Sequence, residues 1–152
     1  MNCHFFNCEV QMMKISISLV LITMLFIGCG KKDESKLTAF SPEAFAYQLD
    51  KGWEVDATTR IKGFEQKESE NKFKVSISFS VDLVTPTGKI IKDVDKKITD
   101  KTENEKIMDI PLETQFDLDT TYLPGNYKVV FNIKDVNTQQ TTTSTAGFKL
   151  GE

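Results

Sequence analysis

The segment that decides the fold is Phe73-Lys74-Val75-Ser76-Ile77-Ser78-Phe79-Ser80-Val81-Asp82-Leu83. Apolar and polar side chains alternate along it without a break, so in a β-strand each set occupies one face. A helix would instead repeat its apolar residues every three or four positions. The segment therefore predicts a long strand with one face buried and the other in water.

The same alternation continues on both sides of this strand. The further runs are 53–61, a less regular one at 89–99, then 108–118, 127–133 and a threonine-rich run that ends at Leu150. Turn residues such as Thr85-Pro86-Thr87-Gly88 separate them, and no helical crossover of the kind that a parallel sheet needs is present. We therefore predict an all-β, antiparallel sandwich of about six or seven strands over residues 37–152.

Two stretches leave their local structure open. Ser41 followed by Pro42 suits the start of a short helical turn, but an edge segment that packs Phe45 and Leu49 fits equally well. Pro111 interrupts the alternation on its outward side, which suits an edge strand or a bulge.

Composition excludes several kinds of chemistry. The 19 basic and 22 acidic side chains give a net charge of −3, which argues against a nucleic-acid partner. The only His is His4 and the three Cys are Cys3, Cys8 and Cys29, so residues 30–152 have neither imidazole nor thiol. Zinc sites of the Cys/His type, Ser-His-Asp and Cys-His catalysis, and disulfides are therefore excluded there. Met108 alone does not make a copper site, and we expect no metal and no cofactor.

The N-terminal residues have the pattern that is typical of a targeting signal. A basic residue precedes the apolar run Ile15–Ile27, which is shorter than the roughly 20 residues of a membrane span and ends at Gly28-Cys29. This arrangement resembles the lipobox of bacterial lipoprotein precursors, with Phe26 where that family usually has Leu. The resemblance implies a signal peptide over residues 1–28, cleavage before Cys29, and diacylglycerol and palmitate on the Cys29 thiol. An ordinary secretory signal cleaved elsewhere and a retained N-terminal helix are the alternatives.

The lipoprotein resemblance also implies a location in the cell envelope. Residues 29–36 would be the lipidated Cys29 and a flexible polar tether. Gly30, rather than Asp, follows Cys29, so the family's sorting rule implies the outer membrane in a host with two membranes. The residues before Met12 and Met13 do not suit a signal peptide, so we expect translation to start at Met13 or Met12.

A second resemblance concerns the segment Leu123-Pro124-Gly125-Asn126-Tyr127. It is similar to the start of the penultimate strand of fibronectin type III and other immunoglobulin-like domains. The resemblance implies an immunoglobulin-like sandwich in which Tyr127 forms a tyrosine corner, its hydroxyl bonding to upstream backbone. The disulfide of antibody domains is absent, so no kinship with antibodies follows.

Two groups of acidic residues could carry chemistry. One group lies in or near a charged loop and could bind calcium, although interleaved lysines favour a solvated surface: Asp93, Asp95, Asp100, Glu103 and Glu105. Asp117 and Asp119 could support glycoside hydrolysis, but two acids on the solvent side of one strand are the more common reason for such spacing.

Two further features could bind a partner. Trp53, Tyr47 and Tyr122 could line a sugar platform, although Trp53 opens an alternating strand and is better placed in the core. Residues 139–145 could offer an uncharged strand edge to an extended peptide, the alternative being a last strand that is already paired on both sides.

These observations favour a lipid-anchored, non-catalytic binding or structural module. Cys29 would hold it to the membrane, and an envelope protein or a glycan would be its partner. A proteinase inhibitor of the bacterial immunoglobulin-like type, with Asp100–Lys106 as its reactive loop, is the alternative. A small carbohydrate-active enzyme using Asp117 and Asp119 is a distant third.

Overall fold

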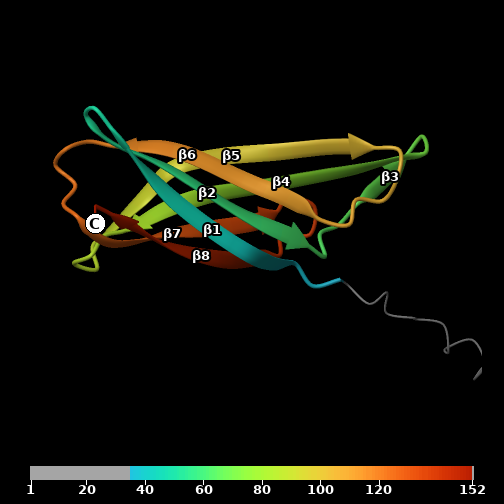
Figure 1. Ribbon diagram of the computed structural model, residues 1–152. Coiled ribbons are helices and arrows are strands. Elements are labelled where there is room, and N and C mark those ends of the chain that lie inside the picture. The colour runs from blue at the N-terminus through green and yellow to red at the C-terminus, as the bar shows by residue number, and fades with distance from the viewer. Residues whose placement is uncertain (1–34, 152) are drawn as a thin grey trace, which may run out of the picture. The chain divides into compact units, whose positions relative to one another are not determined.

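The computed structural model describes residues 35–151, whose regular structure is entirely β-strand (Figure 1). The strands are β1 (Thr38–Leu49), β2 (Gly52–Lys62), β3 (Lys67–Ser69), β4 (Lys72–Val84), β5 (Ile90–Glu103), β6 (Ile110–Leu118), β7 (Gly125–Asp135) and β8 (Thr141–Leu150). No helix among these residues is long and apolar enough to cross a membrane. The predicted signal peptide, Cys29 and the translation start lie outside the described residues.

The strands form two antiparallel sheets. One sheet has the order β1-β2-β6. In the other, β4 pairs with β5 on one side and with β7 on the other, β8 follows β7, and short β3 pairs with the first residues of β4. The prediction of an all-β antiparallel sandwich is confirmed. The strands number eight rather than six or seven, because β3 is too short to show a period in the sequence.

The core lies between the sheets and consists of the alternating apolar residues of the inner faces. Its fully buried members include Val55, Ile61, Ile77, Val81, Leu83, Leu112, Val129, Phe131 and Leu150. The hydroxyls of Thr59 on β2 and Ser144 on β8 form a buried hydrogen bond of 2.9 Å between the sheets. Burial of this apolar set is the main driving force for folding.

β1 settles the choice that the sequence left open. Its residues form an edge strand and not a helical turn, with a register shift between Phe40 and Glu43. Phe45 and Leu49 were expected to pack, and that expectation is wrong, since both side chains are exposed. The small residues Ala44 and Ala46 face the core instead, because β1 lies against β8 of the other sheet.

Two other expectations concern β5 and β6. Pro111 lies in β6, which is an edge strand, as its interruption of the pattern indicated. The prediction of a charged loop over Asp100–Lys106 is wrong for its first half, because β5 continues as far as Glu103. The connection to β6 therefore occupies residues 104–109.

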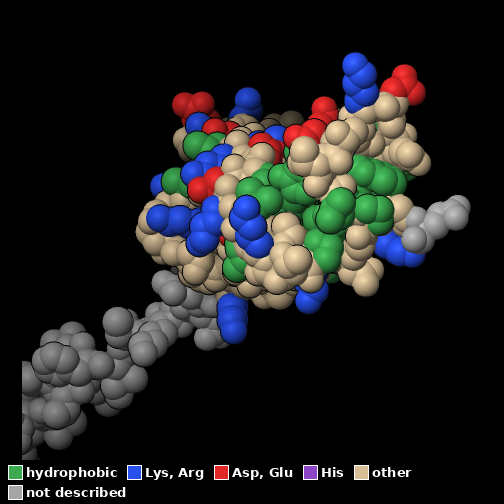
Figure 2. All heavy atoms as spheres, turned by 90° about the vertical axis from the view of Figure 1, so that its left-hand side faces the viewer, with side chains coloured by type: hydrophobic (Ala, Val, Ile, Leu, Met, Phe, Trp, Pro, Cys, Tyr) green, Lys and Arg blue, Asp and Glu red, His purple; other side chains and the backbone are tan. Residues whose placement is uncertain are grey.

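The sandwich has two distinct ends (Figure 1). The N-terminal end carries Ser35 and the connections 63–66, 104–109 and 136–140, and the C-terminal end carries Gly151 and the turns 50–51, 85–89 and 119–124. Figure 2 looks onto the C-terminal end and shows hydrophobic side chains gathered on it. The most exposed large hydrophobic side chains in its turns and adjoining strand ends are Leu49, Ile90 and Leu123.

Candidate functional site

The outer face of the β1-β2-β6 sheet collects carboxylates and aromatic rings. Because the inward positions of β2 and β6 hold the core, the alternate positions point to solvent. We call this surface the acidic face. Phe45 and Tyr47 on β1 expose 54% and 52% of their surface. The carboxylates on it are Glu43, Glu54, Asp56, Glu113 and Asp117.

The strand register places like charges next to one another on the acidic face. Glu54 of β2 stands directly opposite Asp117 of β6, and Tyr47 of β1 stands on its other side. Like charges directly opposite one another destabilise strand pairing. Among residues 35–151, none of the five carboxylates takes part in an ion pair, since the pairs join Arg60 to Asp109 and two lysines of β5 to their neighbours. The carboxylates of the acidic face are therefore not neutralised by ion pairs of their own.

A shallow groove of about 400 Å³ crosses the acidic face. Lys97 closes one side of it, donating a hydrogen bond of 3.1 Å to the carbonyl oxygen of Glu113 while pairing with Asp95 at 3.0 Å. The other lining side chains include Glu43, Phe45, Asp56 and Gln115. An aromatic ring beside carboxylate oxygens can stack on a sugar and accept its hydroxyl donors, or receive a cationic side chain.

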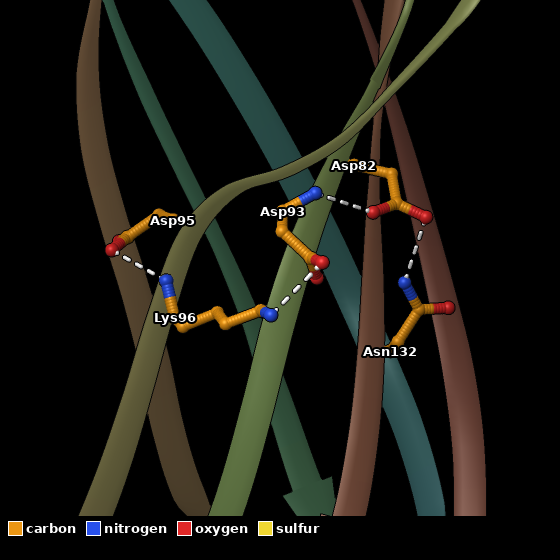
Figure 3. Close-up of polar contacts among 5 residues, drawn as sticks. All are labelled: Asp82, Asp93, Asp95, Lys96 and Asn132. Atoms are coloured by element: carbon orange, nitrogen blue, oxygen red, sulfur yellow. Dashed lines mark hydrogen bonds and ion pairs between the residues drawn. The ribbon is translucent and has the colours of Figure 1, made fainter.

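The other sheet holds a polar network around Asp82 (Figure 3). This carboxylate, 9% exposed, accepts hydrogen bonds from the backbone N–H of Asp93 at 2.9 Å and from Nδ2 of Asn132 at 3.0 Å. Asp93 has a φ of +57° and lies where the β4–β5 register shifts. A buried carboxylate without hydrogen-bond donors would be unfavourable, and Asp82 obtains one donor from the backbone of Asp93. This bond therefore stabilises the bulge in β5.

The predicted calcium ligands are engaged separately. Asp93 pairs with Lys96 at 2.9 Å, and the hydrogen bond from that lysine lowers the pKa of Asp93. Burial acts to raise the pKa of Asp95, but hydrogen bonds from Thr114 and Lys97 outweigh burial and the pKa is lowered. No group of three metal-binding side chains occurs within residues 35–151. The remaining predicted ligands are Asp100, opposite Ser76 on β4, and the exposed Glu103 and Glu105.

The two acids considered for glycoside hydrolysis have different surroundings. Asp117 belongs to the acidic face. Asp119 lies in the turn after β6, where its carboxylate accepts hydrogen bonds from the hydroxyl and the backbone N–H of Thr121. Those bonds, the one from the hydroxyl first, lower the pKa of Asp119. Asp119 thus stabilises its own turn.

The three aromatic residues considered for a sugar platform do not share one surface. Trp53 and Tyr122 pack against the core, whereas Tyr47 lies on the acidic face. The residue that accompanies Tyr47 is Phe45, which the sequence reasoning had placed inside. Alanine at both intervening positions, 44 and 46, was the signal that could have identified the true inward set.

Tyr127 stands at the start of β7, with 3% of its surface exposed. Its hydroxyl donates a hydrogen bond of 2.7 Å to the carbonyl oxygen of Leu123, which is the contact that a tyrosine corner requires. Burial raises the pKa of Tyr127, and the neighbouring Tyr122 adds to the effect. Its ring also stacks on Phe148 of β8.

The threonine-rich strand considered for peptide addition is β8. It is an edge strand that pairs with β7 alone, and β1 of the other sheet lies against it. Gln139 and Gln140 precede the strand in the turn from β7. In that turn, Oε1 of Gln140 accepts a hydrogen bond of 2.9 Å from the backbone N–H of Leu37.

Comparison with protein-family models finds no match, and comparison with curated proteins finds none either. Among solved structures, a family 123 glycoside hydrolase from Clostridium perfringens is similar at 10% identity over 78% of this chain, with a TM-score of 0.47. The chain spans 28% of that enzyme. The N-terminal domain of PorA is similar at 9% identity over 75% of this chain and 96% of its own length, with a TM-score of 0.38. Neither likeness bears on activity.

Proposed function

We propose that this chain is a lipid-anchored cell-envelope protein whose sandwich is a non-catalytic binding module. Cys29 would attach it to the membrane, to the outer membrane in a host with two membranes. The observation that carries the binding role is the exposure of Phe45 and Tyr47 among the carboxylates of the acidic face. The partner is an envelope protein or a glycan.

The acidic face supports this proposal because folding does not require its composition. The inward residues of β1, β2 and β6 already supply the core contacts. Opposed like charges such as Glu54 and Asp117 reduce stability, and local choices that oppose stability tend to mark functional surfaces. A partner that brings cationic groups or hydroxyl donors would relieve that repulsion.

The start of the domain limits the reach of the proposed tether. Gln140 Nε2 donates a hydrogen bond of 3.3 Å to the carbonyl oxygen of Ser35, and the Ser35 hydroxyl donates one of 3.0 Å to the carbonyl oxygen of Gly63. Only residues 30–34 then separate Cys29 from a fixed residue, at most about 20 Å when fully extended. The proposed anchor would therefore keep the N-terminal end of the sandwich close to the membrane.

The anchor is tested by expressing the full chain and its Cys29→Ala variant in a bacterial host with labelled palmitate. We expect label and acyl mass on the mature N-terminus of the parent chain and neither on the variant. An unacylated product cleaved elsewhere, or an uncleaved product, would contradict the anchor without touching the binding role.

The binding role is tested by comparing the parent chain with Phe45→Ala/Tyr47→Ala and with the control Leu123→Ala, which alters an exposed side chain at the C-terminal end. Sedimentation with purified peptidoglycan probes the glycan, and a photo-crosslinking residue at position 45 probes a protein partner in the intact envelope. We expect the double variant to lose binding at least tenfold and the control to keep it. Equal binding by the parent chain, the double variant and the control would refute the role of the acidic face.

A further inference from the structure

The connection between β5 and β6 presents one exposed hydrophobic side chain. After bends at Asn104 and Glu105, residues 106–109 run into β6 without a turn. Met108 in this segment is 82% exposed, more than any other large hydrophobic residue of the described chain. Its neighbour Ile107 points the other way and packs against the core. The segment thus shows the alternation of an extended strand without a strand beside it.

A glutamine side chain holds the backbone just before Met108. Gln66 Nε2 donates a hydrogen bond of 2.8 Å to the carbonyl oxygen of Ile107, and the N–H of Ile107 donates one of 2.8 Å to Gln66 Oε1. Both backbone groups of Ile107 are therefore satisfied by one amide, as they would be by a neighbouring strand. This clamp fixes the direction in which the chain enters Met108.

The residues on either side of this clamp are also held. Asp109, directly after Met108, forms an ion pair with Arg60 of β2. Lys106 places its Nζ 6.0 Å from the centre of the Phe73 ring. Met108 is thus an exposed side chain on backbone that is already ordered. A partner that binds this segment loses little conformational entropy.

We propose that Lys106–Asp109 is an inhibitory loop for a serine proteinase with an apolar S1 pocket, and that the Met108 side chain enters that pocket. Such enzymes bind an extended segment and select the side chain that precedes the scissile bond. This segment begins at the last residue of the predicted reactive loop Asp100–Lys106, whose first half is strand. This inference uses no residue of the acidic face and is independent of the proposed partner there.

The held residues explain why the loop would inhibit and not be consumed. The serine Oγ attacks the Met108 carbonyl, the Met108–Asp109 amide bond breaks, and the catalytic histidine passes the serine proton to the new Asp109 amine. Because Arg60 and β6 retain Asp109, the amine stays beside the acyl group. It can attack that group again, re-forming the peptide bond and returning the proton to serine. Hydrolysis by water then competes poorly.

Ser35 and this loop lie at the same end of the sandwich. If the chain is anchored at Cys29 as proposed above, the proteinase must meet the loop near the membrane surface. We therefore expect an envelope proteinase as the physiological target. Soluble enzymes with the same pocket chemistry serve as probes.

The test titrates the full-length chain, purified in detergent, against chymotrypsin and subtilisin acting on a small chromogenic substrate. We expect inhibition of at least one enzyme at micromolar concentrations or below, while mass spectrometry shows the chain intact. Rapid complete cleavage after Met108, or no effect on either enzyme, would overturn the proposal. Loss of palmitate labelling in the anchor experiment would leave this result unaffected.

Three variants separate pocket recognition from a loss of folding. Met108→Lys should transfer inhibition to trypsin, whose S1 pocket carries a carboxylate, a gain that misfolding cannot produce. Gln66→Ala should weaken inhibition at least tenfold and accelerate cleavage after Met108. The control Leu123→Lys, a change of another highly exposed side chain at the other end, should behave as the parent chain. A Met108→Lys variant that leaves trypsin uninhibited would overturn the assignment of Met108.

Discussion

The two ends of the sandwich are closed in different ways. At the N-terminal end, side chains bind the backbone of distant segments, as Gln140 does with Leu37 and Gln66 with Ile107. At the C-terminal end, the turns close on themselves. The N–H of Gly88 bonds to the carbonyl oxygen of Thr85 at 2.9 Å, and Tyr127 bonds to Leu123 four residues upstream.

This difference separates cooperative structure from local structure. A hydrogen bond between residues far apart in the sequence forms only when the strands that carry them are assembled, so its loss weakens the whole domain. A turn that closes locally can be altered with less effect elsewhere. The N-terminal end should therefore be sensitive to single substitutions, whereas the C-terminal end should tolerate them.

Asp135→Ala tests the sensitive end with the largest expected effect. This carboxylate is 1% exposed and accepts backbone hydrogen bonds from Glu65 at 2.7 Å, Asn137 at 2.8 Å and Thr138 at 3.3 Å. Its removal leaves these donors without a partner, so we expect the free energy of unfolding in urea to fall by about 3 kcal/mol. A change below about 1 kcal/mol would remove the distinction between the two ends.

Gln140→Ala breaks a second tie at the N-terminal end. It removes the bonds to the N–H of Leu37 and the carbonyl oxygen of Ser35. We expect a loss of about 1–2 kcal/mol in stability and faster hydrogen exchange at the Leu37 amide. The Thr121 amide at the C-terminal end, whose hydrogen bond to Asp119 is local, is the internal control, and equal acceleration at both amides would contradict the distinction between the two ends.

Tyr127→Phe tests a local hydrogen bond of the C-terminal end. We expect a loss of about 1 kcal/mol, because the carbonyl oxygen of Leu123 loses its donor while the ring stays in place. Since the pKa of Tyr127 is raised on folding, its stabilisation is present below the unfolded value near 10 and is lost as the pH rises through the folded pKa. The free energy of unfolding of the variant should therefore fall less steeply with rising pH than that of the parent chain. An unchanged melting curve would refute the tyrosine corner.

Asp119→Asn has the smallest expected effect. Folding lowers the pKa of Asp119. Its stabilisation of the folded state is therefore present above the unfolded pKa near 3.9 and is lost as the pH falls through the folded pKa. Because the carboxylate is exposed and its partner is local, we expect the urea midpoint at neutral pH to stay unchanged within error. A carboxyl titration followed by NMR should give Asp119 a midpoint below that of an unfolded Asp, and a normal midpoint would contradict the bond to Thr121.

The fold class could be predicted from the sequence alone, because the buried positions of a half-buried strand are recognisable by the alternation of apolar and polar residues. β4 shows this most clearly, since its apolar residues are the ones that face the other sheet. β1 was misread because its aromatic residues lie outside and its alanines inside, a choice made by the nearness of β8 and invisible in the segment itself. β3, with three residues, has no period to detect.

The candidate sites were harder to predict because they depend on register. Tyr127 could be found from five consecutive residues, since its partner is local. The acidic face needs the pairing of Glu54 with Asp117, and the clamp on Ile107 joins residues 41 positions apart. Such contacts follow from the arrangement of strands, which a one-dimensional pattern does not specify.

The direction of the first and last strands has a mechanical consequence. β1 and β8 both run from the N-terminal end to the C-terminal end, so the described chain begins at one pole and finishes at the other. A pull between Ser35 and Gly151 acts along the β1–β2 and β7–β8 ladders. Their hydrogen bonds would carry the force side by side and break together, not one after another. A domain anchored near Ser35 and bound by a partner at its C-terminal end would thus resist tension in a shear geometry, with its strand hydrogen bonds loaded in parallel.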